Sequence, residues 1–130
     1  MKTVKVVGAV IENENGEILC AIRSANMSMP NLWEFPGGKI QGSELPETAL
    51  VREIHEELGC TLKIGSLLKD ITYEYPTITV NLLTYLATIQ EGEPIALEHA
   101  EIRWVRKENL AELKWAPADL PTVETLISCS

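Results

Sequence analysis

The sequence predicts one domain of the α/β class, in which helices pack on a β-sheet in layers. Two observations indicate this class. Apolar segments of strand length, rich in β-branched residues, alternate with segments of helical periodicity. The chain of 130 residues is 45% hydrophobic, and no repeat, linker or low-complexity segment divides it. We therefore expect residues 1–130 to form a single domain with one substantial core.

Two strands are predicted at the start of the chain, over residues 3–11 and 17–23. Both segments are rich in apolar and β-branched residues. The intervening "ENENG" is a hairpin-like turn signal.

A loop follows in "WEFPGGKIQGSE", from Trp33 to Glu44. Gly37, Gly38 and Gly42 can take backbone angles that are closed to other residues. Such a loop can approach a ligand closely.

Residues 46–58 are predicted to form an amphipathic helix. Leu50, Ile54 and Leu58 recur with a spacing of four residues, which is typical of a helix face that is buried against a core. Pro46 suits the first helical turn, where its missing N–H needs no partner, and Gly59 suits the left-handed residue that ends a helix.

The second half of the chain predicts further strands and two helices. Leu62–Tyr73 is apolar-rich and contains Gly65, which predicts one or two strands. Thr77–Ile89 is the strongest strand candidate because of its β-branched residues. The remaining predictions are a strand at "EIRWV", a short helix at Lys107–Leu113 and a final helix from Ala118.

An acidic stripe lies on the predicted helix beside its apolar face. Each helical residue turns about 100°, so Glu53, Glu56 and Glu57 fall within about a third of the circumference. The three carboxylates repel one another, and a cation would reverse that repulsion. Oxygen ligands without clustered His or Cys suit Mg²⁺ or Mn²⁺ better than zinc. The alternative interpretation is a solvated acidic face, because Glu is a good helix former.

The loop and helix together decide between these interpretations. The segment that begins at Gly38, contains Glu44 and ends in "REIHEELGC" at Cys60 resembles the Nudix hydrolase signature, G-x5-E-x7-R-E-U-x-E-E-x-G-U, where U is a bulky aliphatic residue. All fixed polar and glycine positions match, and Cys60 at the last U position is the one departure. The resemblance implies an α/β/α sandwich around a mixed β-sheet, with a loop-helix-loop catalytic motif.

The resemblance also implies roles for individual residues. The implied metal ligands are Glu56, Glu57, a carbonyl of Gly37 or Gly38, Glu98, and Glu53, which could instead be the general base. Arg52 and Glu44 would brace the loop, with a purely structural ion pair as the alternative. Arg23 and Lys39 are candidates to bind phosphates, although each could be a surface cation. Divalent metals would neutralise the phosphate charge and acidify the attacking water.

A closer resemblance is to the MutT branch of the family. It rests on "LWEFPGGK", "GEP" at Gly92, Glu98 and "WAPADLP". That branch cleaves nucleoside triphosphates to the monophosphate and pyrophosphate. Within "WAPADLP" the branch carries Asn where this chain has Asp119.

Asp119 is therefore the candidate residue for base selection. An ionised Asp accepts hydrogen bonds but cannot donate to a base carbonyl unless it is protonated. We expect 8-oxo-dGTP as the favoured substrate, with (d)CTP hydrolysis as a close alternative. The alternative role of Asp119 is a helix N-cap. Phe35, Tyr75 and Trp115 could stack on the base or belong to the core.

Two other hypotheses compete with a nucleoside triphosphate hydrolase of the MutT branch. Pro76, sixteen residues after the signature, has a spacing seen in ADP-ribose hydrolases. A non-catalytic nucleotide-sensing Nudix module is the other alternative, but such modules usually lose signature carboxylates, and this chain keeps them all. Neither is preferred.

The composition of the chain indicates which partners and which cellular compartment to expect. The net charge of −8 argues against a nucleic-acid polymer as the main ligand and is compatible with a small nucleotide held through metal ions. The chain lacks an apolar run of about 18 residues, and its N-terminus is too quickly polar for a secretory signal. We expect a cytoplasmic protein without a membrane partner, as a monomer or weak homodimer. Cys20, Cys60 and Cys129 are expected to be reduced thiols.

Overall fold

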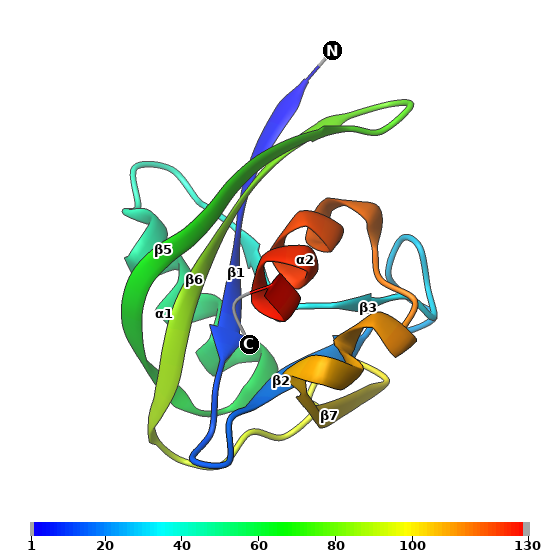
Figure 1. Ribbon diagram of the computed structural model, residues 1–130. Helices are drawn as coiled ribbons and strands as arrows, with labels where there is room; N and C mark the ends of the chain where they lie inside the picture. The colour runs from blue at the N-terminus through cyan, green and yellow to red at the C-terminus, as the bar shows by residue number, and fades with distance from the viewer. Residues whose placement is uncertain (1, 129–130) are drawn as a thin grey trace.

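The computed structural model describes residues 2–128, which form two β-sheets and two α-helices with short 3₁₀ turns (Figure 1). The elements in chain order are β1 (Thr3–Ile11), β2 (Glu17–Ile22), β3 (Trp33–Glu34), β4 (Gly37–Lys39), α1 (Pro46–Leu58), β5 (Thr61–Glu74), β6 (Thr79–Glu91), β7 (Glu101–Arg106), η1 (Lys107–Glu112), η2 (Pro117–Asp119) and α2 (Leu120–Ser128).

The larger sheet has the strand order β4-β1-β6-β5 and is mixed, as expected. β1 runs parallel to β6, and β4 and β5 are antiparallel to their neighbours. The α/β class and the mixed sheet with helices packed on it are thus confirmed.

The sequence did not indicate that a second sheet would form. β2 pairs with β3 and β7 in an antiparallel sheet, although it follows β1 through a tight turn. The reason is that both edges of β1 are already hydrogen-bonded, one to β4 and the other to β6. β2 therefore leaves β1 after the Glu12–Ile18 bridge and pairs elsewhere.

Residues of β1 alternate between two core clusters. Val7 and Ala9 pack in a cluster with Leu50 and Ile54 of α1, and Val10 packs in a cluster that contains residues of α2. Side chains alternate between the faces of a strand, so α1 and α2 cover opposite faces of the larger sheet. The predicted α/β/α layering follows from this alternation.

Helix α1 spans the predicted residues 46–58. Pro46 occupies its first turn, and Gly59 has φ = 70° and donates its N–H to the carbonyl of His55. A left-handed φ at this position favours glycine because other side chains clash there.

Several other boundaries differ from the prediction. β5 is one continuous strand with irregular pairing near Gly65, and β6 begins two residues later than expected. The predicted helix at 107–113 is a 3₁₀ turn, and the final helix begins at Leu120 after a second such turn. Strands β3 and β4 lie within the predicted loop and were missed, because two or three paired residues leave no periodic pattern.

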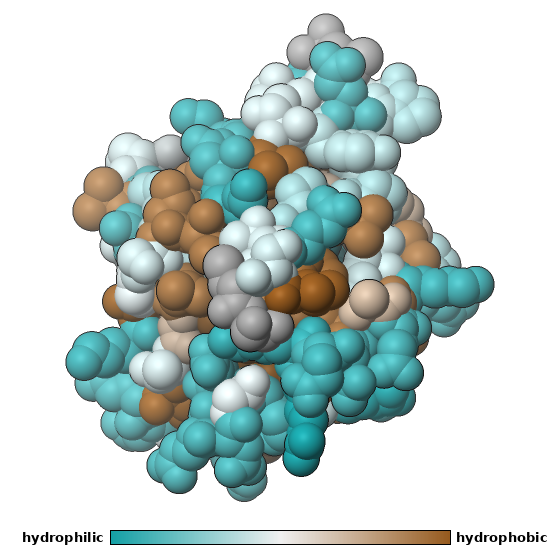
Figure 2. Space-filling model, in the orientation of Figure 1, coloured by the Kyte–Doolittle hydropathy of each residue, from teal (hydrophilic) through white to brown (hydrophobic). Residues whose placement is uncertain are grey.

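Cys20 and Cys60 are buried free thiols, and Cys129 lies outside the described residues. Within residues 2–128, no helix combines the length and apolar character needed to cross a bilayer. Figure 2 shows apolar side chains across the middle of the face that carries α2, above a largely hydrophilic lower region.

Candidate active site

The glycine segment of β4 lies directly against α1. A Cβ at position 38 would overlap the carboxylate of Glu53, and a Cβ at position 37 would overlap the carbonyl oxygen of Val7 on β1. Glycine at Gly37 and Gly38 thus permits a close approach between strand and helix that no other residue allows. This packing places the carbonyl groups of β4 beside the acidic stripe.

Arg52 organises the carboxylates on the exposed side of the stripe. Its guanidinium donates to both oxygens of Glu44, at 2.8 and 3.0 Å. It also donates to Glu53 at 3.0 Å, to Glu56 at 2.9 Å and to the carbonyl of Lys39 at 3.1 Å. The predicted bracing role of Arg52 and Glu44 fits this geometry, whereas the side chain of Lys39 is exposed. The Arg52 hydrogen bond holds the pKa of Glu44 below its usual range.

Glu57 lies on the inner edge of the stripe and is only 7% exposed. Its Oε1 accepts a hydrogen bond from the N–H of Gly37 at 3.1 Å. Burial raises its pKa to about 9, and the negative charges of Glu34, Glu53 and Glu98 add to this shift. At neutral pH, and without a cation, Glu57 therefore holds a proton.

The negative charges that raise the pKa of Glu57 and of Glu53 come from other carboxylates, and this chemistry fits a divalent cation. Burial raises the pKa of Glu53, and the charges of Glu56 and Glu98 raise it further, while Arg52 opposes the shift. Mutual repulsion among oxygen donors is what a hard cation such as Mg²⁺ would relieve. In residues 2–128, however, no three acidic, His or Cys side chains converge closely enough to enclose an ion. Arg52 instead holds Glu53 and Glu56 through its hydrogen bonds.

Glu34 is a site residue that the sequence reasoning missed. One of its oxygens pairs with Arg23, and the other lies 2.8 Å from Nε2 of His99, whose side chain is fully buried. The charge of Glu34 also raises the pKa of both Glu57 on α1 and Asp119 on η2. The only sequence signal was its place beside the glycines in "LWEFPGGK".

Asp119, at the end of η2, is a second buried carboxyl group. It is 6% exposed, and its Oδ1 accepts a long hydrogen bond of 3.4 Å from the N–H of Phe35. Burial raises its pKa well above the usual range, and the charge of Glu34 adds to the effect, while the Phe35 hydrogen bond and Arg23 oppose it. This hydrogen bond joins the Asp119 side chain to Phe35, the residue after β3, and not to the first turn of α2. The geometry therefore disfavours the helix-cap alternative.

The three aromatic candidates occupy different environments. Phe35 and Trp115 are buried, and their rings pack on each other with centroids 4.7 Å apart. Tyr75 is only partly buried, and its hydroxyl accepts the N–H of Ala118 at 3.1 Å. Of the three residues, Tyr75 is the one that is not fully buried, and its hydroxyl bonds to the residue before Asp119.

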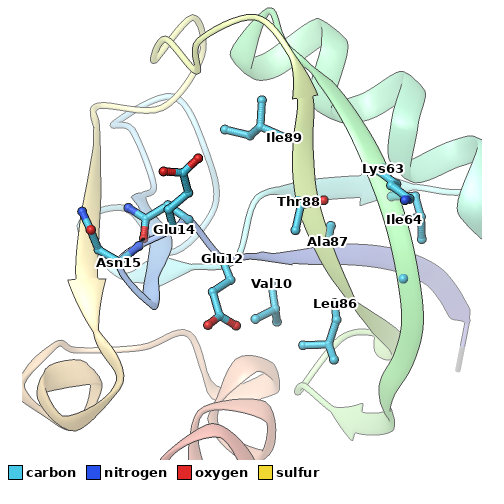
Figure 3. Close-up of a pocket in the computed structure, with 12 residues that line it drawn as sticks. Val10, Glu12, Glu14, Asn15, Lys63, Ile64, Leu86, Ala87, Thr88 and Ile89 are labelled. Carbon is cyan, nitrogen blue, oxygen red and sulfur yellow. Dashed lines mark hydrogen bonds between the residues drawn. The ribbon is translucent and has the colours of Figure 1, made fainter.

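A cavity of about 840 Å³ lies away from these residues. Figure 3 shows Glu12, Glu14 and Asn15 from the β1–β2 turn on one side of it and Lys63 and Ile64 of β5 on the other. None of the predicted site residues lines this cavity, so the acidic site on α1 and β4 remains the candidate.

Comparison with known proteins decides the family. The family model described as the NUDIX domain matches residues 2–126. The chain belongs to the Nudix hydrolase family. Nudix hydrolases act on phosphoanhydride bonds and generally require a divalent metal, in agreement with the oxygen-rich site on α1.

Individual relatives lie in the MutT branch. The chain is 38% identical to the 8-oxo-dGTP diphosphatase of Escherichia coli (strain K12), over 97% of this chain and 98% of that protein. It is 35% identical to the CTP pyrophosphohydrolase of the same strain, over 98% and 94% of the two chains. The solution structure of the DNA mismatch repair protein MutT from methicillin-resistant Staphylococcus aureus 252 shares 42% identity and the whole length of both chains, with a TM-score of 0.81.

Proposed function

We propose that this Nudix hydrolase cleaves nucleoside triphosphates to the nucleoside monophosphate and pyrophosphate, with water as the second substrate and Mg²⁺ as the cofactor. We further propose that 8-oxo-dGTP is the favoured substrate, so that the enzyme removes an oxidised precursor from the cytoplasmic nucleotide pool. The observation that carries the proposal is the acidic site on α1 and β4 in a chain 38% identical to an 8-oxo-dGTP diphosphatase.

The residues of the site fit this chemistry. Glu56, Glu57, Glu98 and a carbonyl of Gly37 or Gly38 would hold the cation, and Glu53 would be a ligand or the general base. When bound, Mg²⁺ would neutralise phosphate charge and polarise the water. Arg52 keeps the stripe ordered through its bonds to Glu53 and Glu56.

Asp119 supports the preference for 8-oxo-dGTP. Burial raises the pKa of Asp119 well above the usual range, which favours the neutral form of its carboxyl group. A neutral carboxylic acid offers one O–H donor and one carbonyl acceptor, as the amide of Asn does. A protonated Asp119 can therefore donate to a base carbonyl and take the place of the Asn that the MutT branch carries.

A second candidate is the hydrolysis of CTP or dCTP. It is favoured by the 35% identity to a CTP pyrophosphohydrolase over 98% of the chain. An ionised Asp119 would accept a hydrogen bond from the cytosine amino group. The protonation state of Asp119 is thus the property that separates the two substrates.

A nucleotide panel tests the proposal. The purified protein is incubated with Mg²⁺ and with 8-oxo-dGTP, dGTP, CTP, dCTP, ADP-ribose or a dinucleoside polyphosphate, and the release of pyrophosphate and phosphate is measured. We expect pyrophosphate release, fastest with 8-oxo-dGTP, and no activity after chelation of the metal. If CTP or dCTP exceeds 8-oxo-dGTP about tenfold in kcat/KM, about 1.4 kcal/mol in transition-state binding, the substrate order is overturned.

A further inference from the structure

The turn η2, which carries Asp119, begins at a proline and has no side-chain cap. Pro117 has no N–H, and Ala116 before it cannot cap the turn with its side chain. The N–H of Asp119 bonds to the carbonyl of Ala116 at 3.0 Å. The N–H of Ala118 is thus left without a partner in its own segment.

That donor is bound by a residue far away in the sequence. The hydroxyl of Tyr75, in the β5–β6 turn, accepts the N–H of Ala118 at 3.1 Å. The turn holds Tyr75 in place, because its own N–H donates to the carbonyl of Ile78 at 2.8 Å and its ring packs on Tyr73 with centroids 4.6 Å apart. Figure 1 shows the β5–β6 hairpin projecting beyond the helices, so this bond ties an extended arm to the loop before α2.

Further hydrogen bonds attach this loop to β3 and to Phe35, which follows β3. Ala116 donates to the carbonyl of Trp33 at 2.8 Å, Trp33 donates to the carbonyl of Lys114 at 2.7 Å, and the carboxyl group of Asp119 accepts from Phe35. That last bond is long, at 3.4 Å, and constrains the carboxyl group weakly. The Tyr75 bond acts on the residue immediately before Asp119.

We propose that Tyr75 is a positioning residue for base selection, whose hydroxyl fixes η2 so that the Asp119 side chain keeps one orientation toward the base. The inference rests on the proposed function and extends it to a residue outside the metal site. The hydroxyl acts through Ala118 and Asp119, so it need not touch the substrate.

Tyr75→Phe tests this inference, with Tyr73→Phe as the matched control. Both changes remove one hydroxyl from the same ring pair, but Tyr75 alone of the two bonds to Ala118. Loss of one hydrogen bond predicts a rise in KM of about 3- to 10-fold for the preferred nucleotide in Tyr75→Phe. Its base preference should flatten, while kcat and the Mg²⁺ concentration dependence stay within about twofold of the wild type. Tyr73→Phe should match the wild type.

Amide hydrogen exchange at Ala118 provides a readout that is independent of activity. Exchange at this amide should be faster in Tyr75→Phe than in Tyr73→Phe or the wild type. Unchanged KM and base preference in an active Tyr75→Phe would overturn the role of Tyr75, and so would an equal loss with all nucleotides that follows a fall in melting temperature. Absence of nucleotide hydrolysis in the wild type would instead overturn the proposed function.

Discussion

The Oε1 atom of Glu57 lies 3.1 Å from the backbone nitrogen of Gly37, so the last turn of α1 is joined to β4 by a carboxyl group that is almost fully buried. With a pKa of about 9, this group is protonated at neutral pH in the metal-free protein. Its negative charge becomes stable only when a cation balances it. Metal binding and deprotonation of Glu57 are thus coupled.

Glu57→Gln should reduce kcat by orders of magnitude, because a ligand charge is lost. The same change should raise the melting temperature of the metal-free protein at neutral pH, since folding no longer has to protonate a buried carboxylate. Glu56→Gln should also lower kcat strongly. Glu47→Gln, an exposed change on the same helix, is the control for charge. Full activity in Glu57→Gln would remove Glu57 from the catalytic machinery.

The stability of the metal-free protein should fall as the pH rises. Glu57 and Asp119 both have raised pKa values when folded. Between its ordinary pKa near 4 and a pH of about 9, Glu57 therefore holds a proton in the folded state that it has released in the unfolded state, and the raised pKa of Asp119 acts in the same direction. Stability is fully present below that window and is lost as the pH rises through it. Melting curves from pH 5 to 9 in a chelator measure this slope. Asp119→Asn should make it shallower, and an unchanged slope would contradict the protonated state of Asp119.

The preference for one nucleotide base over another should also change with pH, because Asp119 ionises as the pH rises. As Asp119 ionises at high pH it loses its donor, so the preference for 8-oxo-dGTP over CTP should decline, whereas Asp119→Asn should keep it at every pH. Asp119→Ala should cost about 1–3 kcal/mol in kcat/KM with the preferred nucleotide and much less with a poor one. If Asp119→Ala slows all substrates alike and lowers the melting temperature, Asp119 has a structural role instead.

The two glycines of β4 should respond differently to alanine. At Gly38 the new Cβ meets the flexible carboxylate of Glu53, so Gly38→Ala should fold normally and lose activity as Glu53 is displaced. At Gly37 the Cβ meets the backbone of Val7, so Gly37→Ala should disrupt the β1–β4 pairing and lower the melting temperature as well. Measuring kcat and melting temperature for both variants separates the two cases. A stable, active Gly38→Ala would contradict the contact with Glu53.

Arg52→Lys should affect activity more than stability. The charge is kept, but an ammonium group cannot bond at once to Glu44, Glu53 and Glu56 as the guanidinium does. Because the ion pairs lie near the surface, the melting temperature should change little, while kcat/KM falls at least tenfold. Arg106→Lys, which alters an exposed pair with Glu108, is the control. An Arg52→Lys variant as active as this control would show that the bonds are dispensable.

Local sequence determined the helix α1 and the acidic stripe that it carries. Pro46, the apolar stripe of Leu50, Ile54 and Leu58, and Gly59 specify both ends and the buried face of α1, because they act through neighbouring turns of one helix. The spacing of the signature likewise indicated the family and the glycine–carboxylate juxtaposition. These features depend on residues that are close in sequence.

Only the tertiary structure decided which carboxyl groups of the site are buried and which of them have raised pKa values. Glu56 and Glu57 are neighbours of the same type, yet one is exposed and the other is buried with a raised pKa, because β4 covers only one side of the helix. The residue type of Asp119 left its protonation state open, and burial together with the charge of Glu34 raises its pKa well above the usual range. Glu34 and His99 meet across 65 residues, and Tyr75 meets Ala118 across 43. Burial and electrostatic coupling arise when distant segments pack together, so no local pattern in the sequence encodes them.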